Sequence, residues 1–97
     1  MAAGDITRDT GSPVAIGGGL MLLTGSIEVD DTKRAFALCH TTSHVKTLTL
    51  VCEDGTGTPE VQVNKNASGT ATNGTVAVLG NDPTVRTYRF NCIFAGF

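Results

Sequence analysis

The sequence has no tryptophan, only three prolines and few charged residues, and it shows no amphipathic helical pattern. Seven basic and nine acidic residues among 97 give a formal net charge of −2. A nearly neutral chain lacks the basic surface with which proteins bind nucleic acid or anionic membranes. We therefore expect neither nucleic acid nor a membrane among its partners.

Long hydrophobic runs are also missing. The one apolar cluster, residues 20–23, is much shorter than the roughly 20 residues that a membrane-spanning helix needs. The amino-terminal residues lack the basic and then apolar order of a secretory signal. We expect a protein that is made and kept in a cytosol.

What the chain does contain is typical of β-structure: fifteen threonines and many valines and isoleucines. The strongest pattern lies in residues 85–97, where four of the five aromatic residues occur. Tyr88, Phe90, Cys92 and Phe94 stand at every second position, so a β-strand places them on one face. We predict that this strand forms the centre of the core.

Further short strands are expected, separated by segments rich in glycine, asparagine and aspartate. They cover residues 20–29, 34–39, 45–53, 60–64, 75–79 and 85–94. Residues 66–74 are expected to form a loop, and residues 80–83 a connection of hairpin length. The pattern predicts an all-β fold: a small antiparallel β-sandwich, jelly-roll or immunoglobulin-like, or a small barrel of about six to seven strands.

Residues 1–19 hold too few apolar side chains to pack as an element of their own, which places the sandwich domain at residues 20–97. One interpretation of this amino-terminal segment is a frayed chain end. The other is an extended arm that leaves the domain at Gly17-Gly18-Gly19 and adds a strand to a neighbouring subunit. In that case Ile6, Val14 and Ile16 would anchor it.

Cys39, His40, His44 and Cys52 are the one group that resembles a set of zinc ligands. Adjacent residues of a strand point to opposite faces, and no Cys-x-x-Cys turn is present. We interpret the three cysteines, with Cys92 as the third, as buried reduced thiols, and we expect no metal site.

No other motif indicates catalysis or a cofactor. The acidic pairs at 30–31 and 53–54 lack the spacing of a calcium loop, and no glycine run precedes a helix that would hold a phosphate. Arg89 is expected to form an ion pair with Asp82 or another neighbour. The sequence therefore predicts no catalytic residue, no cofactor and no enzyme activity.

Three pieces of the chain carry a resemblance: AGDI at residues 3–6, LTGSIEVD at 23–30, and VRTYRF at 85–90 with the closing AGF at 95–97. In these the chain resembles the small β-sandwich decoration, or cement, proteins of tailed-bacteriophage heads. That family carries a glycine-rich link before its second strand, where this chain has residues 31–34 (DTKR).

The resemblance implies a structural virion protein without catalytic residues, made in the bacterial cytoplasm and bound to the capsid surface. Its expected partners are two further copies, in a homotrimer, and the major capsid protein. The alternative is a carbohydrate- or protein-binding β-sandwich module of a phage tail or head. Sugar binding favours exposed aromatic side chains, whereas the core strand uses most of the aromatic residues here.

Overall fold

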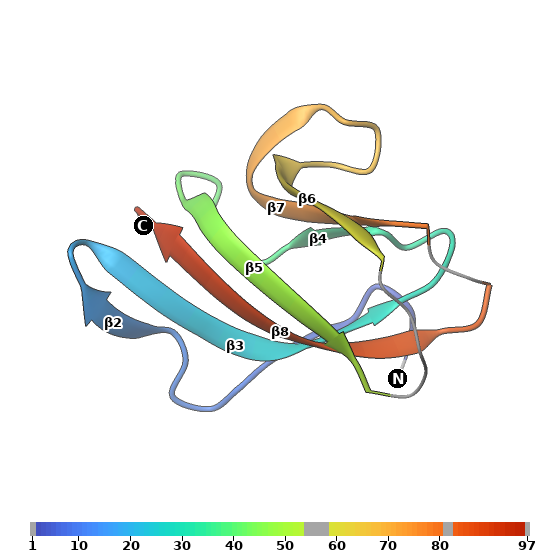
Figure 1. Cartoon of the computed structure of the whole chain (residues 1–97), viewed down its shortest axis with the longest axis horizontal. Coiled ribbons are helices and arrows are strands. Elements are labelled where there is room, and N and C mark those ends of the chain that lie inside the picture. Colours follow the sequence, from blue (N-terminus) through green and yellow to red (C-terminus); the bar gives the residue numbers. More distant parts are fainter. Residues whose placement is uncertain (1, 54–58, 81–82, 97) are drawn as a thin grey trace.

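The computed structural model describes residues 2–53, 59–80 and 83–96, and these form eight β-strands and no helix. The strands build two antiparallel sheets that face each other as a small sandwich, not a closed barrel (Figure 1). They are β1 (Ile6–Arg8), β2 (Val14–Gly17), β3 (Leu20–Val29), β4 (Ala35–Ala37), β5 (His44–Cys52), β6 (Glu60–Lys65), β7 (Ala71–Leu79) and β8 (Arg86–Ala95). The all-β sandwich predicted from the sequence is confirmed.

The larger sheet has the order β1-β3-β8-β5, with β2 also paired to β3, and the smaller sheet has the order β4-β7-β6. Between β3 and β8 the chain changes sheet at every connection except the β6–β7 hairpin. As a result, the strands before that hairpin pair with strands after it. This is the winding of a jelly roll, reduced to six strands.

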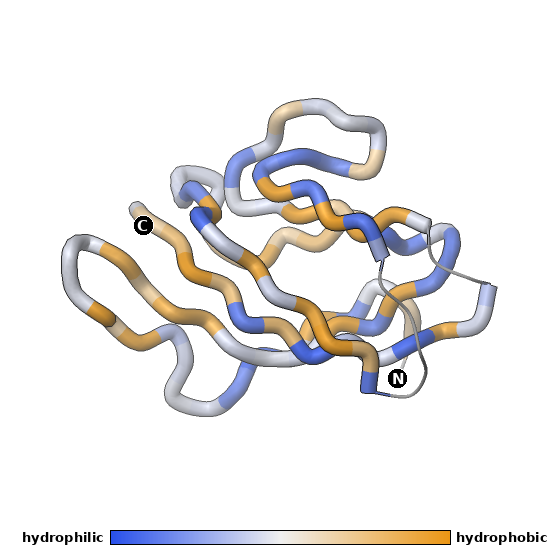
Figure 2. Tube along the Cα trace, viewed as in Figure 1, coloured by the Kyte–Doolittle hydropathy of each residue, from blue (hydrophilic) through white to orange (hydrophobic). Residues whose placement is uncertain are grey.

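The β3–β8 pair forms the middle of the larger sheet. Ten consecutive residue pairs join it without a bulge, from Leu20 opposite Ala95 to Val29 opposite Arg86. At the inward positions both strands carry large apolar residues or cysteine, except at Gly25 and Arg86, so one register places these residues of both strands on the same face. Along the tube in Figure 2, hydrophobic positions recur on these two strands and on β5.

The core lies between the sheets. Tyr88, Phe90, Cys92 and Phe94 are all buried there, as the alternation predicted, with at most 3% of each residue exposed. Side chains from both sheets complete the buried cluster: Leu23, Ile27, Val29 and Val45 from the larger sheet, and Phe36, Leu38, Val76 and Val78 from β4, β7 and the residue after β4. The aromatic strand therefore packs against the smaller sheet along most of its length.

The amino-terminal segment does not extend away from its own chain. Residues 6–8 pair with residues 25–27, and residues 14–17 pair with residues 20–22, so β1 and β2 both lie on the edge of β3. The expected boundary at residue 19 falls in the turn of the β2–β3 hairpin. The physical reason is that β3 would otherwise expose a ten-residue row of unpaired backbone groups.

Two local expectations were wrong. Residues 75–79 and 85–94 do not form a hairpin, because β7 belongs to the smaller sheet and β8 to the larger one. The expected loop at 66–74 is shorter, because β7 already begins at Ala71 and pairs there with Lys65. Local composition indicates turns, whereas the choice of partner strand depends on which apolar faces meet in the core.

Candidate contact surface on the five-stranded sheet

The β2–β3 hairpin closes through a two-residue loop, Gly18 and Gly19. Gly17 pairs with Leu20 on either side of this loop. Both loop residues have positive φ, 64° and 77°, as a type I′ turn requires, and glycine adopts this conformation without steric cost. The glycine run is therefore a hairpin turn that folds β2 back onto β3.

Strand β2 is exposed along its whole length and carries two large apolar side chains. Val14 and Ile16 each expose 47% of their surface. Val51 of β5, near the opposite edge of the same sheet, exposes 63%. These are the large hydrophobic side chains that the described part of the chain leaves most open to solvent.

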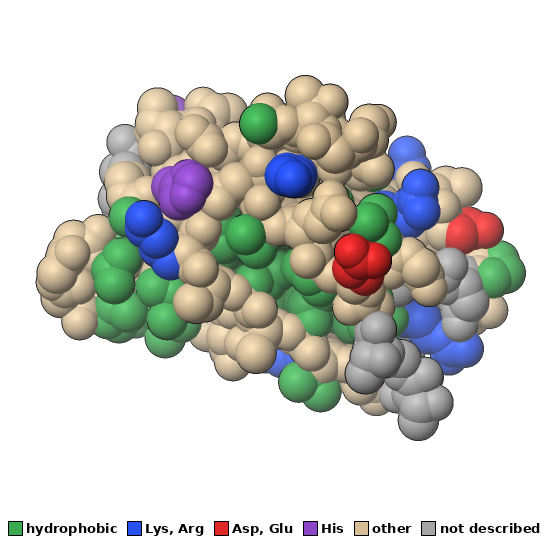
Figure 3. Space-filling view, turned by 45° about the horizontal axis from the view of Figure 1, so that its top comes forward, with side chains coloured by type: hydrophobic (Ala, Val, Ile, Leu, Met, Phe, Trp, Pro, Cys, Tyr) green, Lys and Arg blue, Asp and Glu red, His purple; other side chains and the backbone are tan. Residues whose placement is uncertain are grey.

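Val14 belongs to an apolar row across the outer face of the larger sheet. It lies directly opposite Leu22, which in turn lies opposite Ile93 of β8. Residues paired in this way share a face. Leu22 and Ile93 are half-buried, and the buried residues next to them in the sequence point into the core, so Leu22 and Ile93 lie on the outer face. In Figure 3, hydrophobic side chains are visible at the end of the molecule formed by the β2–β3 hairpin. We call Val14, Ile16, Leu22 and Ile93 the hairpin patch.

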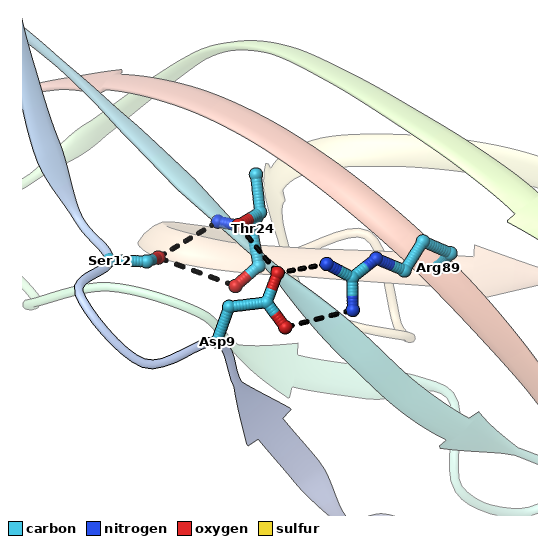
Figure 4. Close-up of polar contacts among 4 residues, drawn as sticks. All are labelled: Asp9, Ser12, Thr24 and Arg89. Atoms are coloured by element: carbon cyan, nitrogen blue, oxygen red, sulfur yellow. Dashed lines mark hydrogen bonds and ion pairs between the residues drawn. The ribbon is translucent and has the colours of Figure 1, made fainter.

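A polar cluster holds the connection between β1 and β2 against the outer face (Figure 4). The Arg89 guanidinium donates to both carboxylate oxygens of Asp9, one of them at 2.8 Å from Nη1. Thr24 Oγ1 also donates to Asp9, at 2.8 Å. Ser12 Oγ accepts from the Thr24 amide at 3.0 Å and donates to its carbonyl at 3.3 Å.

The charges of this cluster support each other. Hydrogen bonds from Arg89 and then Thr24 lower the pKa of Asp9 from its usual value, and the hydrogen bond to Asp9 raises the pKa of Arg89. The ion pair is partly exposed to solvent, so it orients the β1–β2 connection more than it stabilises the fold. Asp82, one partner that the sequence suggests for Arg89, lies outside the described residues.

The structure separates the three expected anchors of the arm. Ile6 is half-buried and packs against the core of its own chain, opposite Ile27. Val14 and Ile16 remain exposed in the hairpin patch. Sequence alone could not separate them, because their exposure depends on the strand against which each one pairs.

The cysteine and histidine residues do not converge. His44 begins β5 and Cys52 ends it, which places them about 26 Å apart at the usual rise of a strand. Among the described residues, no group of three or more His, Cys, Asp or Glu side chains is placed to hold a metal ion. Asp30 instead accepts hydrogen bonds from the Thr32 and Lys33 amides at 2.8 and 2.7 Å, as in an Asx turn.

All three cysteines are free thiols, but only Cys92 is buried, whereas Cys39 and Cys52 are half-buried. Burial raises the pKa of the Cys92 thiol to about 12 and also raises that of Cys39. A raised pKa decreases the thiolate fraction, and the thiolate is the nucleophile. Cys39 and Cys92 therefore have little nucleophilic character at neutral pH.

No pattern in the sequence predicted the roles of Asp9, Ser12 and Thr24. Asp9 and Arg89 are 80 residues apart, and no spacing rule connects them. The signal that was present is local: aspartate and serine flank a glycine in a short connection, where their side chains commonly bond to nearby backbone.

The chain matches no family model, no curated protein and no solved structure. No described segment is a helix long and apolar enough to cross a membrane. A function for the chain therefore follows only from its residues and their geometry.

Proposed function

We propose that this protein is a structural virion protein that decorates and stabilises a bacteriophage capsid through contacts with copies of itself and with the major capsid protein. It works without catalysis. The observation that supports this proposal most is the hairpin patch: Val14 continues into Leu22 and Ile93 on the outer face of the larger sheet, and Ile16 is exposed on the same strand as Val14. An apolar surface of this kind is stabilised when another subunit covers it.

The position of the patch at a sheet edge adds to this argument. Strand β2 pairs with β3 on one side, and within the described chain no strand pairs with its other side. Its sequence, Val-Ala-Ile-Gly, contains none of the charged residues or prolines that commonly protect edge strands from association. Main-chain hydrogen bonds to an added strand and apolar contacts from the patch can therefore act together.

A closed cyclic arrangement uses such a surface without leaving it free for unlimited association. We propose a homotrimer, as the resemblance to capsid decoration proteins implies. In this arrangement the hairpin patch of one subunit covers part of the next subunit. The remaining outer face, with its exposed threonines on β5, is then available to the capsid.

Light scattering on the purified protein tests the self-association. We expect a trimer for the wild type and a folded monomer for the double variant Val14→Glu/Ile16→Glu, because two carboxylates cannot be desolvated in an apolar contact. Thr7→Glu is the matched control: it adds a carboxylate on the neighbouring exposed strand β1 and should leave the trimer intact. A wild type that stays monomeric across micromolar to millimolar concentrations contradicts the proposed assembly.

Co-sedimentation tests the capsid part. Purified protein is mixed with heads of a phage whose genome encodes the chain, and the bound amount is measured by quantitative mass spectrometry. We expect saturable binding at a fixed number of copies per head, and the protein should also occur in purified virions. Its absence from virions, or a lack of saturable binding to heads, contradicts the capsid role even if the protein is a trimer.

No specific observation favours the carbohydrate-binding alternative. The aromatic residues of the described chain, Phe36, Tyr88, Phe90 and Phe94, are each at most 3% exposed. A sugar ring therefore finds no exposed aromatic platform on the described residues. Phe97 lies outside the described residues.

A further inference from the structure

A pocket of about 320 Å³ is lined by residues of β1, β3 and β8, of the β1–β2 connection and of the segment between β4 and β5, and none of these lining residues belongs to the hairpin patch. Its apolar lining comes from Leu23, Leu38 and Phe94, each at most 2% exposed. Pro13 of the β1–β2 connection forms another part of the wall. The pocket therefore has a rigid floor made of core residues, like most small-molecule sites.

Arg8 supplies a fixed positive charge at this pocket. It is an exposed residue of β1, and its Nη2 donates to the carbonyls of Ala37 at 3.1 Å and Leu38 at 2.9 Å. A guanidinium has five N–H donors, and these two bonds use only the Nη2 group. Nε and Nη1 make no hydrogen bond to the described residues, so they can donate to a ligand.

His40 supplies a second donor among the lining residues. His40 Nδ1 lies 2.8 Å from Thr42 Oγ1 and accepts from the Thr42 amide at 3.2 Å, so Nε2 is the ring nitrogen that can donate to a ligand. The other polar lining groups are Ser43 and Cys39, and Ser43 Oγ already donates to the Gly96 carbonyl at 2.9 Å. Among the described residues, no aspartate or glutamate lines the pocket.

We infer that this pocket binds a small organic carboxylate whose body is apolar. The carboxylate would accept hydrogen bonds from Arg8, in the planar geometry that a guanidinium favours, and from His40. The apolar body would lie against the half-buried Pro13 and Cys39, above the core residues Leu23, Leu38 and Phe94. At about 30 Å³ for each water-sized unit, the pocket holds on the order of ten non-hydrogen atoms, the size of a phenylpropanoic or octanoic acid.

Binding is expected to be reversible. The half-buried Cys39 is the thiol among the described lining residues, and burial raises its pKa, so it does not act as a nucleophile toward the ligand at neutral pH. The inference does not depend on the capsid role, since the pocket is built within one chain. The pocket would give this protein a ligand-binding site in addition to its proposed contacts with other subunits and the capsid.

The first experiment titrates the isotope-labelled wild-type protein with 3-phenylpropanoate and follows amide chemical shifts by NMR. We expect saturable shifts centred on the amides of residues 8, 38–40 and 43. The matched neutral ligand, 3-phenylpropan-1-ol, should bind at least tenfold more weakly, because it has no charge for Arg8 to pair with. Equal affinity for the acid and the alcohol, shifts elsewhere, or no binding up to about 10 mM would each overturn the inference.

The second experiment changes the pocket rim. Arg8→Met should weaken binding of 3-phenylpropanoate at least tenfold and leave binding of the alcohol unchanged. Lys65→Met is the control, because it removes the same charge from an exposed position on β6, outside the pocket. If Arg8→Met does not fold, His40→Gln is used instead, because His40 is exposed. His40→Gln should lower the affinity for 3-phenylpropanoate severalfold. An unchanged affinity in the folded variant would contradict the inference.

Discussion

The centre of the larger sheet and its amino-terminal edge differ in the length of their strand pairing and in the burial of their side chains. The β3–β8 pair is continuous over ten residue pairs and buries its inward side chains almost completely. Strands β1 and β2 together pair only six residues with β3, with a register shift in β2, and most of their side chains are exposed. The centre therefore stabilises the fold, whereas the edge offers surface to a partner.

The difference shows how one sheet separates stability from contact. Core burial contributes most of the free energy of folding, so substitutions along β8 act on the whole domain. The edge is held by a few backbone hydrogen bonds and by the Asp9–Arg89 pair. It can therefore vary in sequence, or change its contacts, while the centre stays folded.

The largest expected effect comes from Phe90→Ala at the centre. Phe90 is fully buried, and its truncation leaves a cavity that should lower the free energy of unfolding by about 3–5 kcal/mol. Asn91→Ala, the exposed neighbour on the opposite face, should change it by less than about 0.5 kcal/mol. Urea denaturation measures both, and a similar loss for the two variants would contradict the assignment of the core face.

Gly25→Ala tests the place where centre and edge meet. A Cβ at Gly25 would clash with the Thr7 carbonyl oxygen and lie 3.0 Å from Phe90 Cε2, so β1 would have to move away. We expect a loss of about 1–3 kcal/mol in urea denaturation together with faster amide exchange in β1. Ser26→Ala, on the outer face, is the control, and equal amide exchange in β1 for the two variants would refute the close packing.

A pair of truncations compares two positions within the edge itself. Ile6→Ala should lower the free energy of unfolding by about 1–2 kcal/mol, because Ile6 packs against the core. Val14→Ala should cost less than about 0.5 kcal/mol in the monomer, because Val14 is exposed. The measurement is urea denaturation at a concentration low enough to dissociate oligomers, and the reverse order would contradict the observed pairing of β1.

Asp9→Asn tests the polar cluster through its pH dependence. The pKa of Asp9 is lower in the folded than in the unfolded chain, so its contribution to stability is present above the unfolded pKa of about 3.9. It is lost as pH falls through the lower, folded pKa. We expect a small difference in Tm between wild type and variant at pH 7 that disappears in acid. Asp30 also has a lowered pKa, but it is present in both proteins, so its effect on Tm cancels in the difference. A difference that does not change with pH would contradict the ion pair.

The smallest expected effect concerns the reactivity of the cysteines and requires no change in stability. Cys92 is fully buried, with a pKa near 12, whereas Cys52 at the end of β5 is half-buried. At pH 8, iodoacetamide should modify Cys52 much faster than Cys92. Peptide mass spectrometry measures the extent of modification of each cysteine over time. In denaturant all three cysteines should react at similar rates, and fast labelling of Cys92 in the native protein would show that the centre opens readily.

Several features of the fold could be read directly from the sequence. The expected strand at residues 20–29 has the same limits as β3, and the inward face of β8 was predicted side chain by side chain. Both succeeded because strict alternation of apolar residues leaves only one face that can be buried. The turn at Asp30 was also predictable, because its side chain bonds only to residues two and three positions away.

Glu28 shows where this reasoning stops. The alternation places it on the water-facing side of β3, yet only 5% of it is exposed. Thr87 Oγ1 donates to its carboxylate at 2.8 Å, and the backbone of Gly4 and Asp5 runs alongside it. Its burial depends on residues that are far away in sequence, and no local pattern contains that information.

The sequence by itself determined the β class, the main strands and the face of the aromatic strand that enters the core, because these follow from the two-residue period of side chains. Only the tertiary structure decided that residues 75–79 and 85–94 lie in different sheets, that the amino-terminal segment covers β3, and that Arg8 and His40 meet at one pocket. These features depend on which strands become neighbours. Strand pairing is a non-local choice, made by the burial of whole faces, and a linear pattern does not encode it.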